Sequence, residues 1–152
     1  MTVRWRVFCL LIGLCGWATP AAAGTPIEET VGIFERMVRL ERAYDPALAE
    51  LYTDDAKIEY LHHYPDGSTR EIKMTGAELK SILRKMGPLA KALKSNTRYE
   101  DVRYRIEGRN LMRIEGKRVS VSKKQANPFH MIVGITQDGT WKILSEYGEA
   151  RP

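Results

Sequence analysis

The alternation of apolar and polar residues is clearest between Phe129 and Tyr147, where it predicts two antiparallel strands joined at Gln137-Asp138-Gly139. A three-residue turn with Gly139 in the left-handed conformation puts most of the apolar residues on one face. That face consists of Phe129, Met131, Val133, Ile135, Trp141, Ile143, Ser145 and Tyr147. The opposite face consists of His130, Ile132, Gly134, Lys142, Leu144 and Glu146. We therefore expect the first face to pack against the core. Glu146 is expected on the opposite face, paired with His130 at the surface.

Helical periodicity appears in two longer stretches and one short one. Apolar residues recur along one stripe from Ile27 to Tyr44, and a second short helix is expected over Pro46–Tyr52 after the cap at Asp45. Thr75 and Glu78 form a capping box that begins another helix. We expect Gly87-Pro88 to break that helix, with a further turn or two up to about residue 93.

Period-two alternation predicts the remaining strands. Residues 57–63 and 70–74 are expected to pair across the turn at 65–68, and residues 98–107 form the next strand. In the strand that follows, Met112 and Ile114 lie on even positions whereas Val119 and Val121 lie on odd ones. We expect a β-bulge near Glu115-Gly116, because only an extra residue keeps all four on one face.

The element order and three segments resemble the NTF2-like superfamily, which includes the SnoaL-like and ketosteroid-isomerase groups. The segments are ALAELYTDDAKI (47–58), MTGAEL (74–79) and DGTWKI (138–143). The resemblance implies an α+β, NTF2-like (cystatin-like) cone, in which a strongly bent antiparallel sheet of about six strands wraps around two to three helices. Superfamily members include enzymes and non-catalytic binding domains, so the fold alone does not define the activity.

The resemblance also allows a test for isomerase chemistry. In ketosteroid isomerases the acid that moves the proton lies two residues beyond the position of Ile58, and this chain has Tyr60 there. Their oxyanion-side acid would fall within residues 129–135, which contain no Asp or Glu. No acid–arginine–acid set of the epoxide-hydrolase kind is expected on inward positions, since Asp101 and Arg103 are assigned to the outer face.

The N-terminal residues resemble a secretory signal peptide. Arg4 and Arg6 precede an apolar run, and small residues at 21–23 form an A-x-A cleavage site. The run is shorter than the roughly 20 residues that span a bilayer. We expect export to the periplasm or the medium, with residues 24–152 forming a single domain that does not span the membrane. Both cysteines, Cys9 and Cys15, lie in the signal, so no disulfide or cysteine-bound metal is expected.

The net charge of +5 is unevenly distributed. Residues 24–69 contain 4 basic and 10 acidic side chains, whereas residues 70–124 contain 16 and 6. The basic middle segment favours an anionic ligand or an acidic partner, or it is a solvated outer sheet face. Nucleic acid is not an expected partner, because the chain is exported and the basic residues lack interleaved exposed aromatics.

The candidate site residues are aromatic rather than acidic. A ligand pocket is expected among Tyr60, His62, Tyr104, Trp141 and Tyr147, although the same side chains suit a solid core. His62 with Tyr60 is the only candidate acid–base pair. His62 and His63 point to opposite faces and cannot chelate one metal, and no metal or cofactor signature is present.

Two functions follow from these residues. One is a non-catalytic exported domain that binds a small apolar or anionic molecule, or an envelope protein, through the mouth of the cone. The other is a SnoaL-like isomerase, cyclase or hydrolase that uses His62 and Tyr60. The lack of an inward acid favours binding. A homodimer through Ile132 and Leu144 on the back of the sheet is also expected.

Signal cleavage is directly measurable. Intact-mass analysis of protein recovered from the exported fraction should show a chain that begins at Gly24. A chain that still carries its first 23 residues after export would contradict the signal-peptide assignment.

Overall fold

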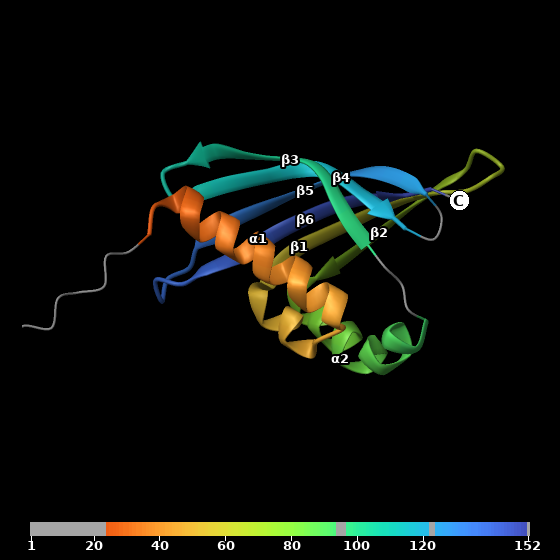
Figure 1. The fold of residues 1–152 in the computed structure, drawn as a ribbon, viewed down its shortest axis with the longest axis horizontal. Helices are drawn as coiled ribbons and strands as arrows, with labels where there is room; N and C mark the ends of the chain where they lie inside the picture. The colour runs from red at the N-terminus through yellow and green to blue at the C-terminus, as the bar shows by residue number, and fades with distance from the viewer. Residues whose placement is uncertain (1–23, 94–96, 122–123, 152) are drawn as a thin grey trace, which may run out of the picture.

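A computed structural model describes residues 24–93, 97–121 and 124–151, and its helices lie on one side of a bent sheet (Figure 1). The predicted signal segment lies outside the described residues. The elements in chain order are α1 (Pro26–Ala43), the 3₁₀ helix η1 (Pro46–Leu51), β1 (Tyr52–His63), β2 (Thr69–Thr75), α2 (Gly76–Leu93), β3 (Thr97–Gly108), β4 (Leu111–Ser120), β5 (Gln125–Ile135) and β6 (Trp141–Ala150). This α+β arrangement confirms the predicted fold class.

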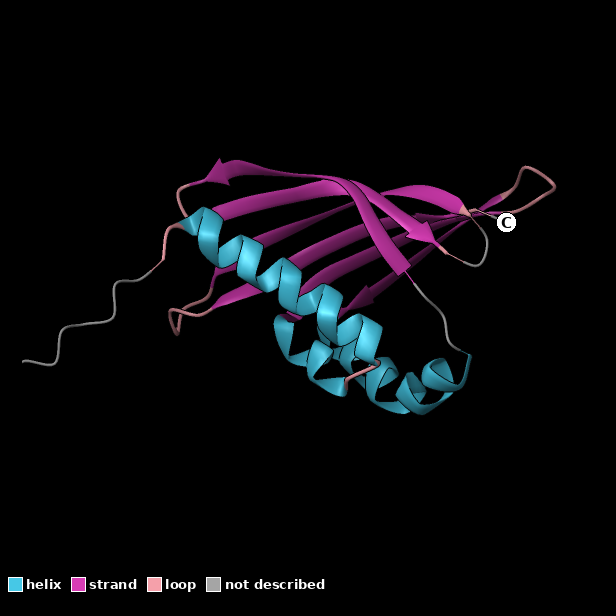
Figure 2. Cartoon of the chain, viewed as in Figure 1, coloured by secondary structure: helices cyan, strands magenta, loops and turns pink. Residues whose placement is uncertain are grey.

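The six strands form one sheet, with the helices on one side of it (Figure 2). The strand order is β2-β1-β6-β5-β4-β3. The pairs β1–β2, β3–β4, β4–β5 and β5–β6 are antiparallel, as expected. The pair β1–β6 is parallel, so the sheet is mixed rather than antiparallel throughout. This pair joins the first and the last strand of the described chain, next to the β2 edge strand.

Local sequence determines where the helices begin. The Thr25 hydroxyl accepts the Glu28 amide while the Glu28 carboxylate accepts the Thr25 amide, which forms a capping box at α1. Thr75 and Glu78 make the same reciprocal bonds at α2, as predicted. The predicted break at residues 87–88 is wrong, because α2 continues to Leu93. A proline there removes the bond to the carbonyl of Arg84, an exposed residue whose carbonyl water can solvate.

The core lies between α1 and the inner face of the sheet. Phe34, Met37 and Leu40 provide the buried stripe of α1. They meet strand residues that are almost fully buried: Ile58, Met112, Ile114, Met131, Val133 and Ile143. The Phe34 ring lies 5.3 Å from Tyr99 and 6.1 Å from Phe129, measured between ring centroids. Aromatic and aliphatic side chains thus fix α1 across the central strands.

A bulge in β3 changes the expected orientation of β4. The irregularity lies at Asp101 and Val102, opposite Gly116, and Asp101 has a φ of 54°. The extra residue therefore belongs to β3 and not to β4, where it was predicted. Because β4 alternates without interruption, Arg118 shares the inner face with Met112 and Ile114, and Val119 and Val121 lie on the other face.

A second bulge, in β6, reverses the predicted faces of its C-terminal half. The three-residue turn is confirmed, with Gly139 at a φ of 81° and Ile135 paired with Trp141. Beyond Ile143 the register shifts by one at Leu144. Glu146 then pairs with Met131 on the inner face, and Tyr147 pairs with His130 on the outer face. The predictions of an outward Glu146, an inward Tyr147 and a His130–Glu146 pair are therefore wrong.

The outer face of the sheet carries a small aliphatic cluster suited to a second copy. Leu111 and Leu144 both lie over Gly134, where a β-carbon would meet each of them at under 3 Å. We propose that this cluster forms part of a homodimer interface. Leu144→Asp should convert a dimer into a monomer in sedimentation at micromolar concentration, while Ile106→Asp, an exposed position on β3, should not. A wild-type monomer unaffected by Leu144→Asp would rule the interface out.

Candidate functional site

A buried carboxylate on the inner face of the sheet accepts hydrogen bonds from two tyrosines. The Tyr52 hydroxyl donates to Glu146 Oε2 at 2.5 Å, and the Tyr60 hydroxyl donates to Glu146 Oε1 at 2.7 Å. Glu146 is only 9% exposed. A buried carboxylate is costly unless hydrogen bonds replace its water, and the two phenols supply such bonds. Glu146 is therefore held in a defined position.

The parallel pairing of β1 with β6 creates this arrangement. Ile58 pairs with Glu146, and Tyr60 pairs with Gly148, so all four positions share the inner face. A β-carbon at Gly148 would lie about 3.0 Å from the Tyr60 ring. Glycine at this position therefore leaves room for Tyr60 to lie over the strand and reach the carboxylate.

A second polar group lies where the end of α1 meets β3 and β4. The Tyr99 hydroxyl donates to Glu41 Oε2 at 2.8 Å, and the Arg118 guanidinium donates to Glu41 Oε1. Tyr99 and Arg118 are cross-strand partners, which brings both side chains to the same side of the sheet. Glu41 thus fixes α1 to two strands through a charged and a neutral hydrogen bond.

Electrostatic interactions join the two polar groups. Burial, followed by the charge of Glu146, raises the pKa of the Tyr52 and Tyr60 phenols well above their usual value. Burial also raises the pKa of Tyr99. Burial disfavours the charge on Arg118, but the surrounding groups outweigh it and raise the pKa of Arg118. The groups that raise it belong to both sets: Tyr99 and Glu41 from the second, and Tyr60 and Glu146 from the first.

A small cavity of about 230 Å³ opens beside Arg118. Its lining consists of Thr97, Arg118, Ser120, Gln125, Asn127, Glu149, Ala150 and Arg151. Asn127 is 8% exposed, and its Oδ1 has no hydrogen-bond partner within the described residues. The Arg118 side chain is 38% exposed. A buried acceptor and a partly accessible cation therefore lie next to the same space.

The structure does not bring the five predicted pocket residues together. Tyr60 points inward, and Tyr104 packs against Phe34 with centroids 6.2 Å apart. Trp141 packs against the core. His62 lies against Tyr64 near the end of β1, at 4.7 Å between ring centroids. Tyr147 lies on the opposite face, where its ring stacks on His130 at 5.0 Å.

Sequence reasoning missed the charged residues of the inner side. No acid–arginine–acid set was expected on inward positions, and the contacts there are an ion pair between Arg118 and Glu41 and the bonds from two tyrosines to Glu146. Glu146 was assigned to the wrong face, and the bulge expected near Glu115-Gly116 implied that Arg118 faces outward, whereas the extra residue lies in β3. Glu41 lies beside Leu40 and Arg42 near the end of α1, where a lone acid has no distinguishing signal.

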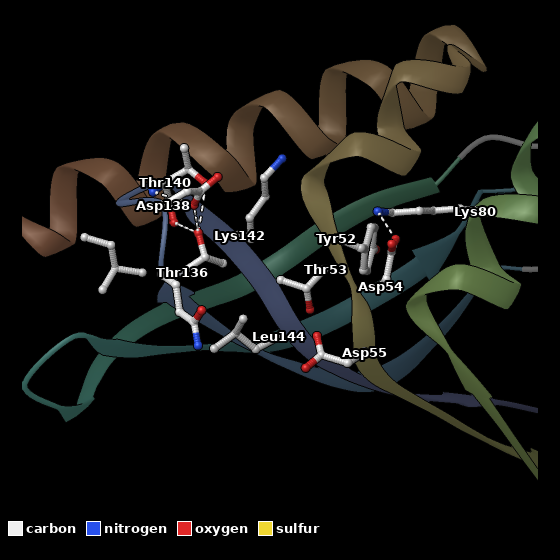
Figure 3. A pocket seen from close by; sticks show the side chains of 12 residues that line it. Tyr52, Thr53, Asp54, Asp55, Lys80, Thr136, Asp138, Thr140, Lys142 and Leu144 are labelled. Carbon is white, nitrogen blue, oxygen red and sulfur yellow. Dashed lines mark hydrogen bonds and ion pairs between the residues drawn. The ribbon is translucent and has the colours of Figure 1, made fainter.

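A separate, open groove of about 600 Å³ lies between the start of β1, α2 and the β5–β6 turn (Figure 3). Lys80 and Asp54 form an ion pair across it at 2.6 Å. Asp138 accepts hydrogen bonds from Thr136 and Thr140, which lower its pKa to about 2. These contacts stabilise the turn and the start of α2. Three of the charged side chains in the groove, Asp54, Lys80 and Asp138, therefore have structural roles.

The described part of the chain offers neither a cluster of metal ligands nor a membrane-spanning helix. Residues 24–93, 97–121 and 124–151 contain no group of three or more His, Cys, Asp or Glu side chains placed to hold a metal ion. None of the described helices has the length and apolar character needed to cross a membrane.

Comparisons with known proteins identify the fold. No family model matches the chain, and no curated protein matches it in sequence. Similar solved structures include an NTF-2 like protein of unknown function from Shewanella oneidensis, with 13% identity and a TM-score of 0.61 over 82% of this chain and 99% of that one. The yeast UBP3-associated protein BRE5 is 11% identical, with a TM-score of 0.60 over 83% and 96% of the two chains.

A ketosteroid isomerase-like protein from Erwinia carotovora is also similar, with 12% identity and a TM-score of 0.50 over 84% of this chain and 97% of that one. The three structures have different descriptions and share the architecture. The chain therefore has the NTF2-like fold, as the sequence resemblance predicted. Identities this low establish the fold and leave the activity to be argued from the site.

The buried tyrosines make the protein sensitive to alkali. In the unfolded chain a tyrosine loses its proton near pH 10, whereas Tyr52, Tyr60 and Tyr99 keep theirs in the folded state. The free energy of unfolding should therefore fall as pH rises above about 10, by about 1.4 kcal/mol per pH unit for each such tyrosine.

Urea titrations followed by circular dichroism at pH 9 to 11 measure this slope. Tyr52→Phe should flatten it, and Tyr64→Phe, at an exposed position, should leave it unchanged. Phenolate absorbance that develops for every tyrosine while the protein is still folded would show that these side chains are not protected.

Proposed function

We propose that this protein is an exported, non-catalytic domain that binds a small molecule on the inner side of its bent sheet, beside Tyr60, Glu146 and Arg118. The observation that carries the proposal is the presence of two carboxylates and an arginine among tyrosines on the core side of the sheet. Apolar residues of similar size would stabilise the fold at least as well. Polar groups at such a position therefore point to binding.

The contacts of Glu146 favour binding over catalysis. Each of its oxygens accepts a hydrogen bond from a phenol, and Tyr52 is only 5% exposed. A general base has to reach a substrate proton, whereas these tyrosines already occupy the carboxylate. The expected His62–Tyr60 acid–base pair has no support either, since Tyr60 donates to Glu146 and His62 packs on Tyr64.

The basic middle segment contributes less to this proposal than its charge suggests. On the strands that form its larger part, Arg105 and Arg113 pair with Glu115, and Lys117 pairs with Asp101. Exposed pairs of this kind add little stability, but they neutralise much of the local field. An envelope protein partner that docks on residues 70–124 is therefore the less favoured form of the binding function.

Native mass spectrometry of protein purified from the exported fraction tests the proposal. We expect a co-purifying small molecule that is retained by wild type and lost in Tyr60→Ala. Tyr147→Ala is the matched control, because Tyr147 is a tyrosine of the same sheet on the opposite face. Thermal melts of both variants establish that each is folded before the comparison is made.

Two results would overturn the proposal. Turnover of a cyclic ketone or an epoxide that is abolished by Glu146→Gln would make the domain an acid–base enzyme of the SnoaL-like kind. Absence of any ligand, together with recovery of one envelope protein whose binding depends on the basic segment, would make it an interaction module.

A further inference from the structure

We propose that the Arg118–Asn127 cavity binds a small carboxylic acid that carries a hydroxyl or ammonium donor next to its carboxylate. This inference rests on the proposed binding function and specifies the chemical class of the ligand. In this arrangement Arg118 binds the carboxylate, and Asn127 selects for the neighbouring donor.

Arg118 has hydrogen-bonding capacity to spare. A guanidinium has five N–H donors in a planar fork, and the described contacts of Arg118 use one nitrogen, which donates to Glu41. Its side chain is 38% exposed and forms part of the cavity lining. The planar fork matches a carboxylate in two parallel hydrogen bonds. Glu41 orients this cation and leaves part of it accessible.

Asn127 supplies the acceptor. It is the cross-strand partner of Arg118, so both side chains lie on the same face of neighbouring strands. The guanidinium nevertheless bonds to Glu41 on α1, and Asn127 Oδ1 is left without a partner among the described residues. A buried acceptor without a partner is destabilising. A ligand that donates a hydrogen bond to Oδ1 would remove this cost.

The charge around the cavity and its volume further restrict the kind of ligand that it can bind. Glu41 partly neutralises Arg118, and the carboxylate of Glu149, also in the cavity lining, is paired with His63 at 3.0 Å and with Arg151 at 3.3 Å. The surroundings are thus nearly balanced and suit a monoanion or a zwitterion better than a phosphate dianion. About 230 Å³ is less than the roughly 300–1,000 Å³ of pockets for drug-sized molecules. The ligand should therefore contain few heavy atoms.

Titration with lactate, propionate and inorganic phosphate tests the inference on the purified protein. Lactate and propionate have the same carbon chain and differ in the hydroxyl group that Asn127 would accept. We expect isothermal calorimetry or ¹⁵N NMR at millimolar ligand to show lactate binding at least about tenfold tighter than propionate, which is the discrimination expected from one unsatisfied buried acceptor. Phosphate should bind more weakly than lactate.

Two variants test whether Asn127 and Arg118 cause the preference for lactate and the binding of the carboxylate. Asn127→Leu should raise the melting temperature, because it removes the unsatisfied acceptor, and it should reduce the lactate preference to about onefold. Arg118→Lys keeps the charge but loses the planar fork, so both carboxylates should bind about tenfold more weakly. Arg105→Lys, on the outer face, is the matched control and should bind as wild type does.

Equal binding of lactate and propionate to wild type would overturn the inference, and so would a lactate preference that survives in Asn127→Leu. If Asn127→Leu does not fold, two results decide whether the inference holds: the order of affinity of wild type for lactate, propionate and phosphate, and the loss of affinity in Arg118→Lys. A ligand that co-purifies and is lost in Tyr60→Ala, while lactate does not bind, would leave the proposed function intact and reject only this cavity as its site.

Discussion

The hydrogen bonds from Tyr52 and Tyr60 to Glu146 are the interaction on which the inner side depends. They place a carboxylate among apolar side chains and fix the parallel β1–β6 pair, since both donors come from β1 and the acceptor comes from β6. Without these donors the carboxylate would face the core unpaired, a cost of several kcal/mol. The same hydrogen bonds therefore hold β1 to β6 and give the candidate site its polar character.

Two irregularities of the sheet make this polar interior available. The bulge at Leu144 turns Glu146 inward. The bulge at Asp101-Val102 allows β3 to stay paired with β4, which has no bulge and points Arg118 inward. Each bulge shifts one strand by a single residue, and a shift of one residue exchanges the two faces of a strand. Without its bulge, β6 would present Glu146 to solvent, and a bulge within β4 would have done the same to Arg118.

The sequence predicted the elements, the fold class and the tight turn at Gly139, because these follow from local periodicity and turn chemistry. It did not predict the faces of Glu146, Tyr147 and Arg118. Those faces were predicted on the assumption that each strand adopts the register with the most apolar residues on one face. The bulges depend on long-range partners such as Tyr52 and Gly116, which no local window contains.

The parallel pairing of β1 with β6 also has a consequence for how the chain acquires its structure. Tyr52 and Glu146 are 94 residues apart, so the centre of the sheet closes only when the last strand reaches the first. Contacts of such long sequence separation slow folding, because the loop entropy is lost before the contact forms. A nascent chain that lacks β6 has no partner for the inner edge of β1. Only β6 joins the β1–β2 hairpin to the β3–β4–β5 strands, so completion of the sheet waits for the C-terminal residues.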